Sequence, residues 1–443
     1  MSAEFDCDVV VVGGGPAGTT LATLLAGRGH VVLLLEKDHH PRFHIGESLL
    51  PANARLFEQL GLRQQVERIG MPKYGVEFVS PQHAHTSHLD FADGWDKSIP
   101  MAWQVRRSEL DRILFEHAAA RGVRAQQGCR VRRIDFDIDG ATVAAVLDDG
   151  AERGWRARVA VDASGRDTLL ANQFGLKHKH RKHNSAALFG HFRGARRLPG
   201  KLEGNISIFW FAHGWFWFIP LADGSTSVGA VCWPHYLKSR ETSLADFFRA
   251  TIAMAPALAE RLEGAELIDD KVWATGNYAY ASERACGERW LLLGDAYAFI
   301  DPVFSSGVYL AMASAFAAVE PVQAMLAGDA RAAAAARARY EAHMQKGPRV
   351  FSWFIVRMTN PAMRQLFMHP RNVLRMKEAV LGMLAGDIFG RTPIWTSLAL
   401  FKLVYWGTSL AMLPRTFAAW RRRRYLIADV GAVKGENVMA PSR

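Results

Sequence analysis

The sequence predicts an α/β protein in which a parallel-sheet domain carries an inserted β-rich region and is followed by helices. Residues 7–36 read as an apolar strand, a glycine turn, a helix and a second apolar strand, which is typical of a βαβ unit. The same alternation returns at about 290–320, whereas residues 186–275 are rich in aromatic and strand-forming residues. The last hundred residues are helical in composition.

The individual elements follow from local patterns. Apolar runs predict strands at 9–12, 31–35, 76–79, 143–147, 158–161, 206–211, 225–231 and 290–293. Helical periodicity places Leu110, Ile113 and Leu114 on one face of a helix at 108–120. Alanine and arginine favour a further helix at 328–340. We expect another helix to begin near Gly307.

The composition narrows the class of protein. A chain of 443 residues is long enough for two or three packed units. Its four cysteines are scattered without metal-ligand spacing, so we expect reduced thiols, a cytoplasmic location and no metal site. The apolar start at 9–12 leads directly into glycines, so we interpret it as a strand rather than a signal peptide.

The net charge of +11 favours acidic partners. We find no nucleic-acid-binding motif and expect no nucleic acid partner. An acidic carrier protein or an anionic membrane surface fits better, and a basic protein without such a partner fits equally well. Residues 394–413 are nearly long enough to span a bilayer, but Lys402 lies within them, so a buried helix is favoured. The four arginines at 421–424 are interpreted as a solvated surface, with peripheral membrane contact as the alternative.

A glycine motif follows the first strand. Gly13, Gly15 and Gly18 match G-x-G-x-x-G, and Ala17 lies inside the motif. Gly13 permits the tight turn, Gly15 lets the backbone approach a pyrophosphate, and Gly18 lets helix and strand pack closely. Glu36, at the end of the second strand, can accept a hydrogen bond from a ribose hydroxyl. Together these residues predict a dinucleotide site.

Residues 215–220 form an unusual aromatic segment, Trp-Phe-Trp-Phe-Ile-Pro. In an extended segment Trp215 and Trp217 project from the same side. Alone, such a segment would be interpreted as the core of a hairpin. Behind a dinucleotide motif, however, it resembles the hallmark of the flavin-dependent halogenases, which general flavin monooxygenases lack. The resemblance implies that Trp215, Trp217 and Pro220 separate the substrate from the flavin.

Further motifs resemble those of the flavin monooxygenase superfamily and imply FAD as the cofactor. Asp295 follows an apolar strand, at the edge where α/β sheets bind ligands, and would contact the ribityl chain; a helix N-cap is the alternative. Arg107 resembles the arginine that pairs with the flavin phosphate, although Arg106 is an equally basic neighbour. Ser48, in Gly-Glu-Ser, matches a motif near the flavin, and residues 161–165 match another.

Residues 299–307 match a second halogenase pattern, F-x-x-P-x-x-S-x-G. Ser305, Ser306 and Gly307 lead into a helix, where backbone N–H groups and the helix dipole favour an anion. The resemblance implies a halide site there, with Gly307 also contacting the flavin. Helix capping alone is the alternative.

Lys73 lies ahead of the strand at 76–79, where the halogenases carry their essential lysine. The resemblance implies that its amine hydrogen-bonds hypohalous acid or forms a haloamine. A separate flavin reductase would supply FADH2, and oxygen with chloride or bromide would give the hypohalous acid. The expected acceptor is a phenolic or pyrrolic ring, free or on an acyl or peptidyl carrier protein, because the insertions of the longer tryptophan enzymes cannot be placed in the chain.

These matches imply a Rossmann-like FAD-binding fold of the flavin monooxygenase type with an inserted β-rich substrate domain and a C-terminal helical region. We divide the chain accordingly into FAD-binding segments (1–72, 105–185, 276–345), substrate-domain segments (73–104, 186–275) and a helical region (346–443).

Two other function classes remain open on the sequence alone. An FAD-dependent monooxygenase or a geranylgeranyl-reductase-type oxidoreductase would share the FAD motifs but not the paired tryptophans with Lys73. A non-catalytic, membrane-associated flavoprotein would account for residues 394–413 and the arginine run.

Overall fold

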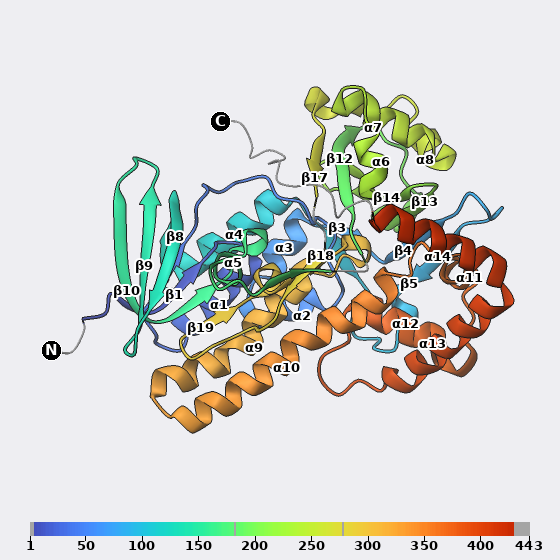
Figure 1. Ribbon diagram of the computed structural model, residues 1–443. Coiled ribbons are helices and arrows are strands. Elements are labelled where there is room, and N and C mark those ends of the chain that lie inside the picture. Colours follow the sequence, from blue (N-terminus) through green and yellow to red (C-terminus); the bar gives the residue numbers. More distant parts are fainter. Residues whose placement is uncertain (1–3, 181–182, 277–278, 429–443) are drawn as a thin grey trace.

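The computed structural model describes residues 4–180, 183–276 and 279–428 and has the predicted α/β architecture (Figure 1). Its first sheet contains five parallel strands: β1 (Cys7–Val12), β2 (Val32–Leu35), β7 (Arg124–Gln126), β10 (Glu152–Asp162) and β19 (Trp290–Leu292). Strand β1 lies between β2 and β10, β7 pairs with β2, and β19 pairs with β10. The carboxyl ends of these strands therefore meet at one edge of the sheet.

Strand β10 is long enough to serve two parts of the fold. Its second half is parallel to β1 and β19, whereas its first half pairs antiparallel with β9 (Ala141–Leu147). Strand β9 in turn pairs with β8 (Cys129–Phe136). These three strands form the projecting antiparallel lobe at one end of Figure 1.

Helices cover the parallel sheet. Helix α1 (Pro16–Ala26) packs against α4 (Arg107–Ala120) and α9 (Gly307–Ala327), and α10 (Ala330–Ile355) packs against α9. The valines at 9–11 in β1 are completely buried, as the apolar run predicts. The remaining small elements are α2 (Asn53–Leu60), α3 (Arg63–Ile69), α5 (Leu169–Gln173), the pair β3 (Met71–Lys73) and β6 (Ala102–Gln104), and the sheet of β11 (Lys177–Lys179), β18 (Ala279–Ser282) and β20 (Ala298–Ile300).

The second sheet is mostly antiparallel and has the order β16-β12-β15-β14-β13-β4-β5, with β17 beside β12. Its strands are β4 (Gly75–Val79), β5 (Ser87–Asp90), β12 (Ala186–Arg193), β13 (Ile206–Phe211), β14 (Gly214–Pro220), β15 (Ser225–Cys232), β16 (Glu266–Leu267) and β17 (Trp273–Thr275). The sheet thus joins two segments that are far apart in the sequence, because β4 pairs in parallel with β13.

The two faces of this second sheet pack against different helices. Phe216 and Phe218 point to one face, toward α7 (Leu244–Ala253) and α8 (Pro256–Arg261), with α6 (Pro234–Lys238) nearby. Trp215 and Trp217 point to the opposite face and join the core formed with the C-terminal helices. The alternation of the strand therefore assigns the tryptophans to the side that faces the rest of the molecule.

Four helices form the C-terminal end: α11 (Pro361–Met368), α12 (Met376–Ala385), α13 (Ile394–Ala411) and α14 (Leu413–Ala428). The expectation that residues 394–413 form one buried helix is wrong in two respects. Helix α13 ends at Ala411, where the chain bends by 98° into α14. Only one face of α13 is buried, and Leu403 and Leu410 on the other face are 66% and 70% exposed.

The arginine run also differs from the expected solvated surface. Arg421, Arg422 and Arg424 are exposed, but Arg423 turns inward. Its guanidinium lies 3.0 Å from Nδ1 of His183 and also donates to the carbonyl oxygen of Val356. One of the four charges therefore anchors α14 to the body of the molecule.

Two segments in the described part of the chain are long and apolar enough to cross a membrane, judged by length and composition alone. They are α9, and α13 with α14 if the bent pair is counted as one span. Half of the α9 segment is buried inside the protein, where it packs against α1 and α10. Helix α9 is accordingly a core helix of the FAD-binding domain.

Gly229 in β15 lies directly opposite Trp217, and a Cβ atom there would overlap the indole ring. We expect Gly229→Ala to lower the free energy of unfolding by about 1–3 kcal/mol, because overpacking displaces the buried ring. Urea denaturation measures the change. Gly154→Ala is a matched control, since the nearest atom to its Cβ is 3.6 Å away. Equal stability of the two variants would contradict the close packing of Trp217.

Candidate active site

The parallel sheet ends at a cavity of about 810 Å³, within the usual range for small-molecule sites. Loops after β1, β2, β10 and β19 contribute to its wall, as expected for ligand sites of open α/β sheets. The cavity brings together most of the residues expected from the sequence: Gly13, Gly15, Ala17, Glu36, Ser48, Arg107, Trp215, Trp217, Asp295, Ser305, Ser306 and Gly307. Lys73, Gly18 and Pro220 lie outside its wall.

The glycines of the first loop have distinct structural requirements. Gly13 has a positive φ of 109°, and a Cβ atom at Gly18 would overlap the carbonyl oxygen of Gly13. Both glycines are therefore required by the protein backbone itself. A Cβ atom at Gly15, by contrast, would approach only Nη2 of Arg42, at 3.7 Å. The open space at Gly15 faces the cavity, which fits the close approach of a pyrophosphate.

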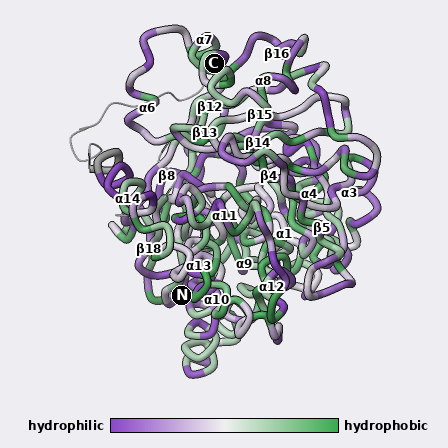
Figure 2. The backbone as a smooth tube through the Cα atoms, turned by 90° about the vertical axis from the view of Figure 1, so that its right-hand side faces the viewer, coloured by the Kyte–Doolittle hydropathy of each residue, from purple (hydrophilic) through white to green (hydrophobic). Residues whose placement is uncertain are grey.

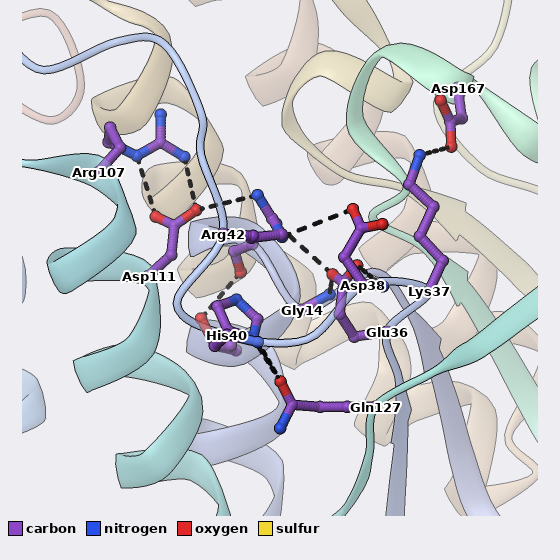
Figure 3. A network of polar contacts seen from close by, with 12 residues as sticks. Gly14, Glu36, Lys37, Asp38, His40, Arg42, Arg107, Asp111, Gln127 and Asp167 are labelled. Atoms are coloured by element: carbon purple, nitrogen blue, oxygen red, sulfur yellow. Dashed lines mark hydrogen bonds and ion pairs between the residues drawn. The ribbon is translucent and has the colours of Figure 1, made fainter. Parts of the chain in front are cut away.

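Charged side chains form a connected network beside this loop (Figure 3). Glu36 accepts hydrogen bonds from the backbone N–H groups of Gly14, at 2.6 Å, and Asp38, at 2.9 Å. The guanidinium of Arg42 lies 3.5 Å from both Glu36 and Asp111. Arg42 thus bridges the acid that ends β2 to the acid on α4.

Arg107 closes the network on its other side. It donates two parallel hydrogen bonds to Asp111, at 2.9 and 3.0 Å, and a third to the carbonyl oxygen of Ile45. Burial disfavours the charged form of Asp111, yet the charges of Arg107 and Arg42 hold the pKa of this carboxyl below its ordinary value. Arg106 points elsewhere, to Asp223 and Ser225, so Arg107 is the arginine of this pair that lines the cavity.

Arg42 belongs to none of the motifs recognised in the sequence. Its Nε is buried without a hydrogen-bond partner, and its guanidinium lies next to Gly15. A ligand phosphate at Gly15 would face Nη2 of Arg42, the nitrogen of this guanidinium that lies beside the glycine. The only signal in the sequence is a basic residue six positions after Glu36, which is too common a pattern to indicate a site.

Asp295 lies in the short turn between β19 and β20 and lines the cavity. Burial raises the pKa of Asp295 to about 6, although the positive charges of Arg166 and Arg107 oppose the rise. The segment 161–165 forms the neighbouring wall. There, the buried Asp162 accepts hydrogen bonds from the N–H groups of Ser164 and Leu170 and so fixes the loop.

Ser305, Ser306 and Gly307 lie at the start of α9, as expected, but they do not contribute equally to an anion site. Ser305 is in the left-handed region, with φ of 57°, and its N–H already donates to the carbonyl oxygen of Pro302. Ser306 and Gly307 occupy helix-start positions, whose N–H groups lack an intrahelical partner. A Cβ atom at Gly307 would meet nothing within 4 Å, so the backbone is open to the cavity at this point.

Lys73 lies in a second, much smaller cavity of about 20 Å³. The side chain is only 2% exposed, and its Nζ donates to Ser48 Oγ, at 3.0 Å, and to the carbonyl oxygen of Leu49, at 2.9 Å. Among the described residues no carboxylate pairs with it. Burial alone therefore lowers the pKa of Lys73 to about 7.

The two cavities are neighbours. Ile206 and Ser305 line both of them. Ser48, which lines the large cavity, is also the hydroxyl that accepts from Lys73. The side chain of Ser48 thus lies between Lys73 and the large cavity, and Lys73 itself does not line that cavity.

Trp215 and Trp217 lie at the large cavity as expected, whereas Pro220 does not. Trp215 and Trp217 are buried with ring centroids 6.1 Å apart, and Trp217 Nε1 donates to Ser227 Oγ. The third side chain of β14 at the large cavity is that of Ile219. Pro220 follows it by one residue and therefore belongs to the opposite side of the strand. The period of two along a strand is the signal that could have identified Ile219.

Two further groups at the cavity were not expected. Glu47 is 2% exposed and contacts Nε2 of His191 at 2.7 Å, while its second carboxylate oxygen has no hydrogen-bond partner. Phe43 lines the cavity and stacks on Trp273 at 4.4 Å. The described residues contain no cluster of three or more histidine, cysteine, aspartate or glutamate side chains suited to a metal ion.

We expect Gly15→Glu to abolish FAD binding without unfolding the protein. The new side chain would occupy the position of the pyrophosphate and place a negative charge beside it. The structure has space for it, since Arg42 is the only neighbour. Flavin fluorescence titration measures binding, and thermal unfolding checks the fold. Gly154→Glu, on the exposed hairpin strand, is the control. Undiminished FAD affinity would refute the assignment of this loop.

The buried amine predicts a pH-dependent stability. The folded pKa of Lys73 is about 7 and its ordinary value is 10.5, so between these pH values the unfolded chain binds more protons. Lys73 therefore destabilises the fold progressively as the pH falls from 10.5 to 7, by up to about 1.4 kcal/mol per pH unit, and constantly below 7.

Lys73→Met removes this effect. Its stability relative to the parent should be highest at pH 7 and decrease toward pH 10.5, as measured by urea denaturation across that range. The half-exposed Lys201 provides the control variant Lys201→Met. A stability difference independent of pH for Lys73→Met would show that the amine is charged in the folded protein.

Comparison with known proteins agrees with this geometry. The FAD binding domain family matches residues 6–346. A flavin-dependent halogenase of Armillaria mellea, armH3, is 35% identical over 349 residues, which cover 73% of this chain and 68% of the relative. A Pseudomonas fluorescens chlorinase, named for 1H-pyrrole-2-carbonyl on a peptidyl-carrier protein, is 30% identical over 337 residues, covering 71% and 75%.

Other matches extend the comparison. A tryptophan 2-halogenase of Chondromyces crocatus is 33% identical over 334 residues, covering 74% of this chain and 63% of its own. The solved structure of the myxobacterial chondrochloren halogenase CndH has a TM-score of 0.76 and 31% identity, over 88% of this chain and 92% of that one. These matches favour the halogenase interpretation over the two alternatives. The chain belongs to the flavin-dependent halogenases, a family of FAD-dependent oxidoreductases.

Proposed function

We propose that this halogenase uses FADH2, oxygen and chloride or bromide to halogenate a phenolic or pyrrolic ring through hypohalous acid and Lys73. One observation carries the proposal: the buried amine of Lys73, which pairs with no carboxylate in the described part of the chain, lies directly behind the wall of the cavity that fits FAD. Burial of this charge costs a large amount of free energy. Groups whose pKa is perturbed in this way concentrate at functional sites.

The residues of the large cavity fit FAD. Gly13 and Gly15 would lie along the pyrophosphate with Arg42, and Glu36 and Asp295 would hold the ribose and the ribityl chain. Reduced FAD would supply the oxidative chemistry, with the overall balance FADH2 + O2 + X⁻ + H⁺ giving FAD, H2O and HOX. We place the halide at the N–H groups of Ser306 and Gly307, where the dipole of α9 adds positive potential.

Ser305 and Ile206 define the route to the lysine, because they line both cavities. Near neutral pH a pKa of about 7 leaves part of Lys73 uncharged. The neutral amine can take the halogen from HOX as an N–X bond, and the charged form can instead hold HOX by a hydrogen bond. By the N–X route, water forms together with the N–X bond, and the proton displaced from the ring returns to the amine when the ring takes the halogen. By the hydrogen-bonded route, the ring takes the halogen directly and its displaced proton leaves with the oxygen as water.

Trp215 and Trp217 would shield the acceptor ring from the flavin, so that the halogen and not oxygen reaches it. Enclosure by these rings also keeps bulk water from the reactive HOX. The small cavity is sized for about one water molecule, so it cannot hold an aromatic ring as it stands. Side chains that line it, such as Phe304 and Leu384 of α12, would move when the acceptor binds.

We expect Lys73→Ala to retain FAD binding and oxidation of FADH2 by oxygen while losing halogenated product. The reason is that the amine acts after the flavin chemistry. Mass spectrometry after incubation with a flavin reductase, NADH, oxygen, bromide and a panel of phenols, pyrroles and tryptophan measures the product. The protein alone, without reductase, should oxidise NADH negligibly, because we propose a separate reductase.

Lys201→Ala is the matched control for Lys73→Ala and should keep full halogenation, since its side chain is 57% exposed. Product formation by Lys73→Ala at the parental rate would remove the lysine from the mechanism. Fast oxidation of NADH by the protein alone would instead favour a monooxygenase.

The acceptor is proposed to be carried on an acidic acyl or peptidyl carrier protein, with a free phenol or pyrrole as the alternative. The net charge of +11 and the relative named for a carrier-bound pyrrole support this proposal. We expect turnover of a carrier-bound ring to slow as ionic strength rises, because charge steers docking, while turnover of a free neutral phenol stays constant. Steady-state rates at two salt concentrations test this. Equal salt sensitivity of the two substrates would favour a free acceptor.

A further inference from the structure

A continuous row of apolar side chains lies on the outer face of α13 and α14. We call it the outer stripe: Leu403, Trp406, Leu410, Leu413, Phe417 and Trp420. The spacing alternates between three and four residues, so the first three side chains share one face of α13 and the last three share one face of α14. These side chains are 66%, 51%, 70%, 55%, 56% and 49% exposed, respectively. Such a large exposed apolar patch is unusual on a soluble protein and marks an interaction surface.

The outer stripe is not needed to hold the helices in place. Helix α13 packs through its opposite face, where Ile394, Leu398, Phe401 and Tyr405 are buried against the C-terminal core. Helix α14 contacts α6, α11 and α13 and is anchored by the inward-pointing Arg423. Each helix therefore packs one face against the rest of the protein and exposes apolar side chains to solvent on the opposite face.

The segment of the chain that carries the outer stripe has charges of one sign only. Residues 388–428 contain no aspartate or glutamate and seven basic residues: Arg391, Lys402, Arg415 and the arginines at 421–424. Three of the four arginines in the final run are exposed. Figure 2 shows the hydrophilic end of α14 next to the more hydrophobic helices of this end of the molecule. This segment thus combines exposed apolar side chains with a net positive charge.

We propose that α13 and α14 dock onto the surface of an anionic lipid bilayer, with the outer stripe inserted among the headgroups. Helices that lie in the membrane interface combine leucine, phenylalanine and tryptophan with basic flanks in this way. The 98° bend and the central Lys402 argue against a span. A second copy is disfavoured as the occupant, because the bend interrupts a helix-pairing seam and two basic surfaces repel each other.

The test is co-sedimentation of the full-length protein with vesicles of phosphatidylcholine alone or mixed with phosphatidylglycerol. We expect binding to the anionic vesicles to be roughly tenfold stronger or more, and to weaken with added salt. The triple variant Leu403→Gln, Leu410→Gln, Phe417→Gln should lose most of this binding. The double variant Arg421→Gln, Arg422→Gln should lose several-fold and become less sensitive to salt.

Ile138→Gln is the matched control, since Ile138 is 87% exposed on the distant hairpin lobe and should leave vesicle binding unchanged. FAD affinity, measured on each variant, verifies the fold independently of vesicles. Equal binding to neutral and anionic vesicles, or none to either, overturns the proposal. So does a concentration-dependent dimer in sedimentation velocity that the triple variant abolishes while vesicle binding is absent.

Discussion

Parallel pairing of β1 with β2 and β10 is the constraint on which the rest of the site depends. Because these strands run in the same direction, their carboxyl ends bring the glycine loop, Glu36 and Ser164 to one sheet edge, and β19 adds Asp295 there. Helix α1 starts so close to the end of β1 that Gly18 has no room for a side chain. The network of Arg42, Asp111 and Arg107 then closes the cavity from the side of α4.

Burial of the Lys73 amine is a second constraint on the structure. Lys73 is held by two neutral oxygen atoms, from Ser48 and Leu49, and is surrounded by apolar side chains. A core built only for stability would not contain such a group, since burial disfavours its charge. The molecule therefore gives up stability at this position, as active sites commonly do. The same burial leaves part of the amine uncharged near neutral pH, as the proposed transfer of halogen to Lys73 requires.

The sequence was sufficient wherever one local pattern determines the structure. Four strands of the parallel sheet (β1, β2, β10 and β19), the start of α9 and the shared face of Trp215 and Trp217 follow from periodicity and glycine chemistry, whereas β7 was not predicted. The sequence was insufficient where partners come from distant segments. Arg42 matters because α4 places Asp111 beside it. Pro220 is a different case, because the local period of two in β14 already indicates Ile219 in its place. Apolar content alone could not show that only one face of α13 packs inward.

The contact of Arg423 with His183 has a practical consequence for handling this chain. His183 also contacts Asp301, at 3.2 Å, and Asp301 accepts from the N–H group of Val303 in the turn that precedes Ser305. The end of α14 is thereby connected to the loop at the flavin cavity. A C-terminal truncation that removes Arg423, of the kind often made to improve crystallisation, would remove this contact and disturb the loop at the flavin cavity. A C-terminal truncation should therefore retain all residues up to 428, and an affinity tag should be attached after residue 428.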